Sequence, residues 1–349
     1  MDLHHLIATP DLVAIRMRRT LVPLDGPDVP VFPPTYPPPE RGQHRFDSPY
    51  TINQLRDGTL VVDLDSVQSQ ANRMEAAFSG PLIHLVPQHQ VIAGTHAVSL
   101  VELPHRIADA AARATDLRDP IHAAMLAYAA GDPGPVARLC PTALVYGAWD
   151  SRDTRVKIPR AVRSEIRAHD VSVATRSAQF TGTFKADELG LDASEWVLGA
   201  DAGFADTPSV NAHGGVYVHG EIIHTASILL APLRRGDDAI LAAYLLGLAV
   251  AGLLHAMREM RLRVGCELLP AGPARWELIQ VDGGHETVEV EAANIEEQLT
   301  SAATAWADSA TVRLGKPPAE HRYDPKAGKA AIKEVADAKK KSKKSATQD

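Results

Sequence analysis

The sequence predicts an α+β protein, and three observations support this fold class. A short apolar run, Leu60-Val61-Val62, follows an Asp57-Gly58 turn and has the composition of a buried strand. Apolar residues at helical spacing come directly after it. Two further strand-like runs, 276–281 and 287–290, flank Asp282-Gly283-Gly284, which is a strong hairpin turn. Strands and helices therefore both occur, in mixed order.

The helix after the first of these strands lies within Asp63–Phe78, which reads DLDSVQSQANRMEAAF. Asp65 and Gln68 have the spacing of a capping box, so the helix is expected to begin at Asp65. Four apolar side chains share one face and are expected in the core: Val67, Ala71, Met74 and Phe78. The other side carries Ser69 and a dense set of amide and guanidinium groups: Gln68, Gln70, Asn72 and Arg73. The alternative to a binding surface is a solvated polar helix face.

The remaining elements follow from local patterns. Eight prolines in Pro23–Pro39 predict a stiff extended loop, and Gly182–Ser209 is expected to be irregular and acidic. Ile240–Met257 is long and apolar enough to cross a bilayer, but its alanines, glycines and His255 favour a buried helix. The other expected strands are Leu12–Leu21, His96–Leu103 and Asp170–Phe184, and the other expected helices are Pro104–Ala114, Pro120–Ala130 and Ala293–Ala307.

Positive charge is concentrated between Ser151 and Ala168, where six cations face only Asp153 and Glu165. If Pro159 starts a helix, three of the arginines lie on one face. Arginine suits phosphate because its planar fork donates two parallel hydrogen bonds and keeps its charge. The alternative is a solvated basic face that pairs with acidic neighbours. The candidate phosphate ligands are Arg152, Arg155, Lys157, Arg160, Arg163 and Arg167.

The overall composition indicates a globular chain with an uneven charge distribution. With 349 residues and 45% hydrophobic content it is expected to form one body over residues 1–325 and a lysine-rich, disordered tail over 326–349. Eight lysines against three acids give the tail +5, which leaves −12 on the rest of a chain whose formal charge is −7. Two distant cysteines, Cys140 and Cys266, without a signal peptide, indicate reduced thiols and a cytoplasmic location.

Motifs of common enzyme classes are missing from the sequence, including those of nucleotide-binding loops, serine hydrolases and paired metal-binding cysteines. His219, Glu221 and His224 form H-G-E-I-I-H, which differs from the zinc motif, and a strand would turn the two histidines to opposite faces. The sequence therefore predicts no metal or cofactor site, and these motifs identify no catalytic residue. Gly214-Gly215 would let backbone approach a phosphate closely.

Three blocks of the sequence resemble the family-seven backbone subunit of type I-G CRISPR effector complexes, formerly called type I-U, a branch of the RAMP superfamily. They cover much of the chain from about Pro33 to Leu269, in the order of that family. The blocks are DSVQSQANRMEAAF within Asp63–Phe78, GAWDSRDTRVKIPRAVRSEIR at Gly147–Arg167, and GGVYVHGEIIHTASILL at Gly214–Leu230.

This resemblance implies an RNA-recognition-motif-like, or ferredoxin-like, core with large insertions of the palm, thumb and finger type. It also implies a non-catalytic protein whose copies stack head to tail along CRISPR RNA and hold it for pairing with target DNA. The implied partners are CRISPR RNA, the target strand, further copies, a repeat-RNA-processing subunit and a large subunit, with no membrane. The projecting thumb would come from Gly182–Ser209 or Pro81–Gly94.

Two alternative functions remain open at this point. Some RAMP proteins cleave RNA, and fifteen histidines leave an acid–base endoribonuclease possible, although no spacing supports one. A nonspecific single-strand binder of another family would coat any RNA equally. A CRISPR backbone subunit would leave RNA intact, unlike the endoribonuclease, and would need its partner subunits, unlike the nonspecific binder.

Overall fold

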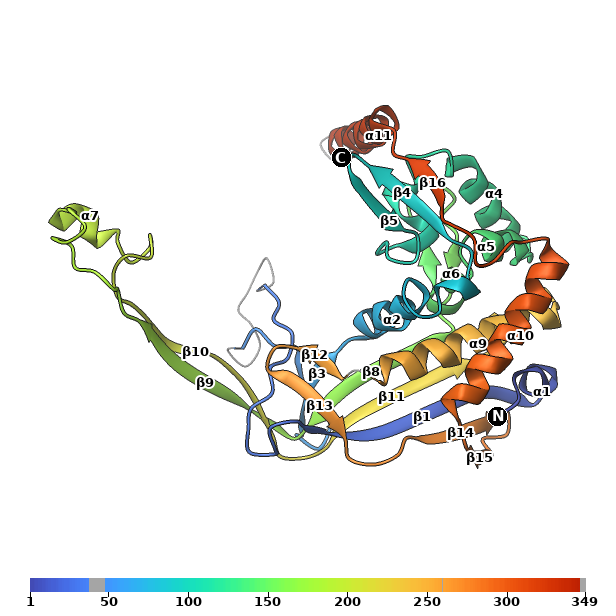
Figure 1. Ribbon diagram of the computed structural model, residues 1–349, viewed down its shortest axis with the longest axis horizontal. Coiled ribbons are helices and arrows are strands. Elements are labelled where there is room, and N and C mark those ends of the chain that lie inside the picture. Colours follow the sequence, from blue (N-terminus) through green and yellow to red (C-terminus); the bar gives the residue numbers. More distant parts are fainter. Residues whose placement is uncertain (38–47, 259, 346–349) are drawn as a thin grey trace.

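The centre of the computed structural model, which describes residues 1–37, 48–258 and 260–345, is a curled antiparallel sheet (Figure 1). Four of its strands follow the order 4-1-3-2 of a ferredoxin-like βαββαβ unit. This confirms the predicted α+β class with a ferredoxin-like core. In chain order the unit is β1 (Leu12–Pro23), α2 (Val67–Glu75), β8 (Val162–His169), β11 (Ile222–Leu229), α9 (Ala239–Ala256) and a fourth strand divided into β13 (Cys266–Pro270) and β14 (Arg275–Gln280).

The fourth strand of this unit is interrupted, and both parts pair with β1. Pro270 of β13 lies opposite Leu21, and Arg275 of β14 lies opposite Arg18. The interruption contains Gly272-Pro273, and proline cannot donate a hydrogen bond to a neighbouring strand. Additional strands widen the sheet: β2 (Ile52–Gln54) and β3 (Leu60–Asp65) beside β8, β12 (Arg261–Arg263) beside β13, and β15 (His285–Val288) beside β14. The predicted hairpin at 282–284 is the β14–β15 turn, as expected.

Helix α9 lies at the centre of the core on one face of the sheet, as the apolar run predicted. It is long and apolar enough to span a membrane, the only such helix among the residues described, and 78% of it is buried inside the protein. Asp238 caps it by accepting from the backbone N–H groups of Ile240 and Leu241. It packs against α2, against α1 (Leu3–Ala8), against α6 (Thr142–Tyr146) and against α10 (Ala292–Ala310), which extends the helix predicted over Ala293–Ala307 at both ends.

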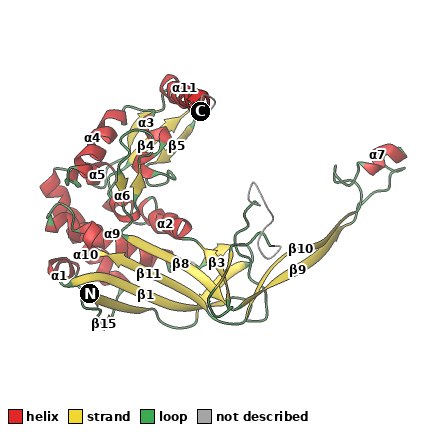
Figure 2. Ribbon diagram, turned by 180° about the vertical axis from the view of Figure 1, so that it is seen from behind, coloured by secondary structure: helices red, strands yellow, loops and turns green. Residues whose placement is uncertain are grey.

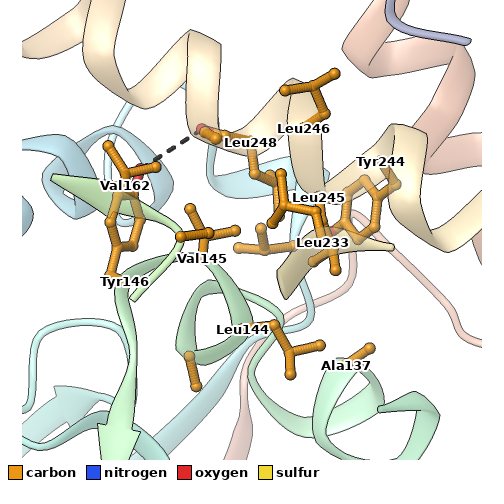
Figure 3. Close-up of a cluster of buried hydrophobic side chains, with 14 of the residues drawn as sticks. Ala137, Leu144, Val145, Tyr146, Val162, Leu233, Tyr244, Leu245, Leu246 and Leu248 are labelled. Atoms are coloured by element: carbon orange, nitrogen blue, oxygen red, sulfur yellow. Dashed lines mark hydrogen bonds between the residues drawn. The ribbon is translucent and has the colours of Figure 1, made fainter. Parts of the chain in front are cut away.

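Aromatic hydroxyl groups tie α9 to its neighbours (Figure 3). Tyr146 of α6 donates to the carbonyl of Leu248 at 3.5 Å, and Tyr244 of α9 donates to the carbonyl of Leu85 at 2.7 Å. The Tyr244 ring stacks on Trp306 of α10 with centroids 4.7 Å apart. These bonds satisfy polar groups that would otherwise be buried without a partner.

A largely helical insertion of residues 76–161 separates α2 from β8. The helix predicted over Pro104–Ala114 is instead a 3-10 turn, Arg106–Ala108, followed by the short helix α3 (Ala110–Arg113), and the extended Asp109 separates the two. The strand predicted over His96–Leu103 is confined to its first four residues. The insertion contains β4 (His89–Ala93), β5 (His96–Ser99), α3 (Ala110–Arg113), α4 (Arg118–Ala129), α5 (Gly134–Leu139), α6, β6 (Ala148–Trp149) and β7 (Lys157–Ile158). Pro81–Gly94 is therefore part of the body.

A two-stranded arm projects from the body (Figures 1 and 2). It consists of β9 (Val171–Phe180) and β10 (Thr207–Val218), joined by a tip at residues 181–206 that contains α7 (Ala193–Val197). Of the two segments considered for a projecting hairpin, the acidic Gly182–Ser209 region is the one that projects. The proline-rich segment 24–37 contributes only single bridges, Val31 to Val216 and Thr35 to Tyr50, whereas Pro38 and Pro39 lie outside the described residues.

The structure differs from two sequence predictions, one in the second block and one near the C-terminus. The segment after Pro159 forms strand β8, not a helix, because Val162, Ser164, Ile166 and Ala168 alternate into the core with a period of two. Residues Pro325–Ser345 form helix α11 where a disordered tail was expected over 326–349, of which residues 346–349 lie outside the described residues. Alanine and lysine, which dominate that segment, have high helix propensity. The short strand β16 (Ala319–Arg322), which pairs parallel to β4, connects α10 to α11, and α8 (Leu230–Leu233) precedes α9.

Candidate nucleic-acid interface

Helix α2 begins at a different residue from the one predicted. Ser66 is the N-cap, and its hydroxyl accepts from the backbone N–H of Ser69 at 3.3 Å. Asp65 is instead buried and turned into the protein. The predicted apolar face is confirmed, since Ala71, Met74 and Phe78 are buried, while Val67 at the first turn is half-buried.

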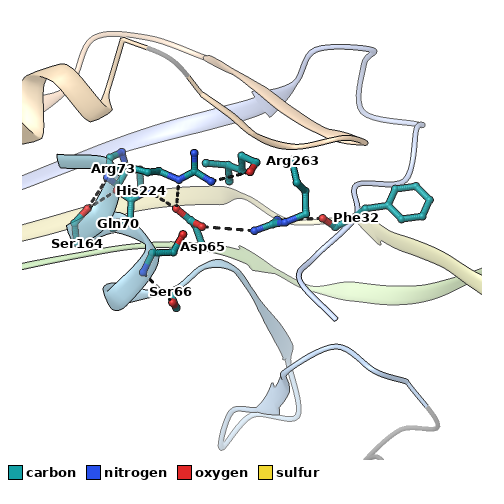
Figure 4. Close-up of polar contacts among 10 residues, drawn as sticks. Phe32, Asp65, Ser66, Gln70, Arg73, Ser164, His224 and Arg263 are labelled. Carbon is teal, nitrogen blue, oxygen red and sulfur yellow. Dashed lines mark hydrogen bonds and ion pairs between the residues drawn. The ribbon is translucent and has the colours of Figure 1, made fainter. Parts of the chain in front are cut away.

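Asp65 organises a cluster of polar side chains at the start of α2 (Figure 4). One carboxylate oxygen accepts from Gln70 Nε2 at 2.6 Å and from Arg73 Nε at 2.8 Å. The other lies 3.5 Å from a guanidinium nitrogen of Arg263 on β12. The two guanidinium groups also donate to backbone carbonyls, Arg73 to Leu262 and Arg263 to Phe32. Asp65, the last residue of β3, therefore holds both arginines in fixed positions.

Gln70 extends this cluster into the core, away from solvent. The hydroxyl of Ser164 donates to Gln70 Oε1 at 2.9 Å, so it accepts from Nε2 of His224, 2.8 Å away. His224 is fully buried, and burial together with the nearby Arg19 guanidinium lowers its pKa to about 3. Because both ends of its amide are bonded internally, Gln70 is unsuited to the ligand role predicted for it. Gln68 and Asn72 are exposed, and Arg73 is partly exposed.

A buried ion pair connects the far end of α2 to the basic second block. Arg106 Nε donates to Glu75 at 2.6 Å, and another nitrogen of the same guanidinium donates to the carbonyl of Gly147 at 3.0 Å. Burial raises the pKa of Glu75, while Arg106 opposes that shift. Gly147 has φ 82°, and a Cβ there would lie 3.1 Å from the Ile158 carbonyl, so the close turn requires glycine. The first two blocks, distant in sequence, thus meet at Arg106.

The loop between β6 and β7 is built around a single buried carboxylate. Asp150 accepts from the backbone N–H groups of Asp153 and Thr154 at 3.1 and 2.9 Å, and from the Thr154 hydroxyl at 2.8 Å. Arg113 of α3 donates to it at 2.7 Å. Burial alone would raise the pKa of Asp150, but these hydrogen bonds and Arg113 hold it below its ordinary value. The loop is therefore held in one conformation.

This loop presents a group of cations beside an aromatic ring. Arg152, Arg155 and Lys157 are exposed, and no ion pair joins any of them to a carboxylate among the residues the structure describes. Lys157 lies opposite Trp149 in the hairpin, with its Nζ 4.5 Å from the ring centroid. The only acid that the loop exposes, Asp153, is 2.7 Å from Nδ1 of His122. We call Trp149, Arg152, Arg155 and Lys157 the loop platform.

The other arginines of the second block are placed differently. Arg163 and Arg167 lie on the open face of the sheet, on either side of Glu165 along β8. Arg163 pairs with Glu165 at 3.3 Å, whereas Arg167 pairs with Glu165 at 3.0 Å and with Asp63 at 2.9 Å. Arg160 is half-buried and donates to the Tyr146 carbonyl at 3.1 Å. The shared helical stripe predicted for these three arginines does not exist.

The same face of the sheet carries further cations, and these are also paired. Arg16 lies 2.6 Å and Arg275 lies 2.8 Å from carboxylate oxygens of Glu277, and Arg18 lies 3.3 Å from Glu221. Charge on this face is therefore nearly balanced. The loop platform, by contrast, carries excess positive charge.

The two glycines predicted to approach a phosphate instead approach the chain itself. A Cβ at Gly214 would lie 2.6 Å from the Thr175 backbone of β9, and one at Gly215 would lie 2.6 Å from the Val31 carbonyl. Gly215 also donates its N–H to the Tyr50 hydroxyl at 2.9 Å. Both glycines are buried, so their close contacts serve to pack the root of the arm.

The histidines of the third block lie apart. His219 follows β10 and is 2.8 Å from the Ser172 hydroxyl, whereas His224 is buried in β11. In the described part of the chain, no group of three or more histidine, cysteine or acidic side chains could hold a metal ion.

Sequence reasoning missed two members of this region. Trp149 lies inside the basic block, so an aromatic residue among cations was the signal that could have found it. Arg263 comes from β12, 190 residues after Arg73, and only the fold brings the two arginines to Asp65.

Comparison with known proteins places part of the chain beside a described family. Residues 15–173, a little under half of the chain, match the family described as CRISPR-associated protein GSU0053 (Cas_GSU0053). The matched range runs from β1 to the start of β9 and includes α2 and the loop platform, but not the glycines of β10. No curated protein matches the chain. The family match supports a CRISPR-associated protein.

Proposed function

We propose that this chain is a non-catalytic, RNA-binding backbone subunit of a type I-G CRISPR effector complex, the Cascade that surveys DNA for antiviral defence in the cytoplasm. Several copies lie along one guide RNA and leave its bases free to pair with target DNA. In such complexes base pairing carries sequence specificity, whereas the protein holds the RNA backbone.

The observation that carries this proposal is the loop platform within the family-matched region. Three exposed cations, none of them paired with a carboxylate of the described residues, form a site to which phosphate groups can bind, with release of counterions. The body is acidic overall, so this local excess of positive charge matters more than the formal charge. The exposed part of α2, namely Gln68, Asn72 and Arg73, supplies further donors to the ribose-phosphate chain.

The arm supports the proposal that copies associate with one another. Its tip, residues 181–206, contains one lysine and six acids, a formal charge of −5, which disfavours contact with RNA. The tip nevertheless exposes large apolar side chains: Phe184 (58%), Val197 (77%), Leu198 (65%) and Phe204 (52%). An apolar, acidic surface at the end of a projecting arm suits contact with protein. Repeated contacts of this head-to-tail kind produce an open helical filament.

The test is to express the protein with and without a CRISPR repeat-spacer RNA and the neighbouring subunits, and to measure particle mass and RNA length. A large particle holding several copies on one intact guide-length RNA is expected. If the purified protein stays monomeric without RNA in the presence of its partners, the backbone proposal is wrong. If it shortens the added RNA, the alternative of an RNA-cleaving RAMP enzyme is favoured instead.

A further inference from the structure

Trp149 occupies an unusual position for a tryptophan. It is 58% exposed, whereas Trp276 and Trp306 are buried in the core, and it lies in a two-residue strand instead of a large sheet. Tryptophan normally buries much of its large apolar surface, so an exposed ring on a small hairpin indicates that another molecule covers it.

The hairpin holds this ring in place by contacts that do not involve the ring itself. Asp150, the next residue, is fully buried and is bonded to Arg113 and to the backbone of the loop. Gly147, two residues earlier, is fixed by Arg106. The ring is therefore presented on a preformed support, which lowers the entropy cost of binding a partner.

The surroundings of the ring select the kind of partner. Lys157 lies over the ring at 4.5 Å, and Arg152 and Arg155 extend from the same loop. Large exposed aromatic side chains also occur on the arm tip, but there they lie among acids. An aromatic ring next to cations that have no carboxylate partner in the described part of the chain matches a single-stranded nucleic acid, in which a base stacks while flanking phosphates meet the positive charges.

We propose that Trp149 stacks on one unpaired base of the bound RNA while Arg152, Arg155 and Lys157 contact the adjoining phosphates. This inference rests on the proposed function, because it adds one base contact to a subunit that otherwise holds the RNA backbone. Stacking tolerates any base, so the contact fixes the position of a nucleotide without reading its identity.

The test compares the full-length protein with its Trp149→Ala and Trp149→Phe variants on two ligands. One ligand is single-stranded oligoadenylate of about 12 nucleotides, within the range that single-strand binders cover. The other is an abasic ribose-phosphate chain of equal length, which keeps the charge and removes the bases. Affinity for both is measured at the same salt concentration, together with the melting temperature and with quenching of tryptophan fluorescence.

Trp149→Ala is expected to weaken binding to oligoadenylate by about 5- to 150-fold, the range that corresponds to alanine substitution of one aromatic residue stacked on a base, and to leave abasic binding unchanged. Trp149→Phe should keep part of the difference between the two ligands and lose RNA-dependent quenching. If Trp149→Ala lowers the melting temperature, Trp149→Phe carries the test through these two readouts.

Other results overturn the inference in distinguishable ways. Equal affinity of wild type and Trp149→Ala for oligoadenylate, or an equal loss on both ligands, rejects stacking but leaves the proposed function standing. Unchanged RNA affinity with fewer copies per particle assigns Trp149 to a protein contact. Absence of wild-type binding to both ligands rejects the proposed function and the stacking contact together.

Discussion

Removing two charges from the loop platform gives the sharpest test of the proposed RNA-binding site. In the Arg152→Gln, Arg155→Gln double variant both side chains stay long and polar but lose their charge. Neither guanidinium has a carboxylate partner among the described residues, so the change leaves no buried or paired acid behind. Stability is therefore expected to stay close to that of wild type, which a thermal melt checks.

The size of the effect follows from counterion release. Each phosphate contact on a single strand contributes about 0.7 to the slope of log affinity against log salt, so two contacts contribute about 1.4. Between about 50 and 200 mM salt, wild type should therefore lose about sevenfold more affinity than the double variant. Fluorescence anisotropy of a labelled single-stranded RNA over a salt series measures this difference.

The matched control is Arg313→Gln with Lys316→Gln, which removes the same charge from two exposed residues between α10 and β16. Its salt slope should remain that of wild type. The reasoning is refuted if the loop variant keeps the wild-type slope, or if the control loses as much slope as the loop variant, because the effect then reflects net charge and not the loop.

Three further predictions concern the core, the buried histidine and the arm. Gly252→Val on α9 should lower the free energy of unfolding by about 1–3 kcal/mol, because a Cβ at Gly252 would meet the buried Tyr146 hydroxyl. Chemical denaturation measures this loss, and Gly272→Val at an exposed position serves as the control. The pKa of His224 is about 3 when folded and near 6.5 when unfolded, so the unfolded chain binds the extra proton and stability falls as the pH drops from about 6.5 toward about 3. His224→Gln keeps the donor to Ser164 and should flatten that fall in urea titrations; an identical pH dependence in both proteins would contradict the assignment. Val197→Asp with Leu198→Asp at the arm tip should reduce the number of copies per particle in mass measurements and leave the melting temperature and the RNA affinity of a single copy unchanged, whereas an unaltered particle would argue against the tip as a contact.

Local patterns predicted the elements whose signals are strong and short in range. The apolar run of α9, the Asp-Gly-Gly hairpin and the core face of α2 are decided by residues within a few positions of one another. The segment after Pro159 shows where such patterns conflict. The spacing of Arg160, Arg163 and Arg167 is typical of a helix, but the buried side chains from Val162 onward alternate with the period of a strand. Pairing with β3 and β11 stabilises the strand.

The candidate site was less predictable because long-range packing decides which polar groups remain free. Gln70 and Arg163 look like equally good ligands in the sequence, but Ser164 and Asp65 bind the first and Glu165 pairs with the second. Gly214-Gly215 has the composition of a phosphate loop, yet the backbone of β9 and Val31 occupy the space beside it. Only the fold distinguishes these residues from the cations of the loop platform, for which the described structure contains no carboxylate partner.

The close packing of Gly214 and Gly215 fixes the direction of the arm at its root. The ten residues of β9 span about 33 Å, so a rotation of about 10° at the root moves the tip by about 6 Å. Val216 exchanges hydrogen bonds with Val31 at that root, and Gly215 is bonded to Tyr50. The direction in which the tip points is thus determined near the body. A methyl group added at Gly214 or Gly215 would displace the neighbouring backbone, and the resulting shift would grow along the arm toward the tip.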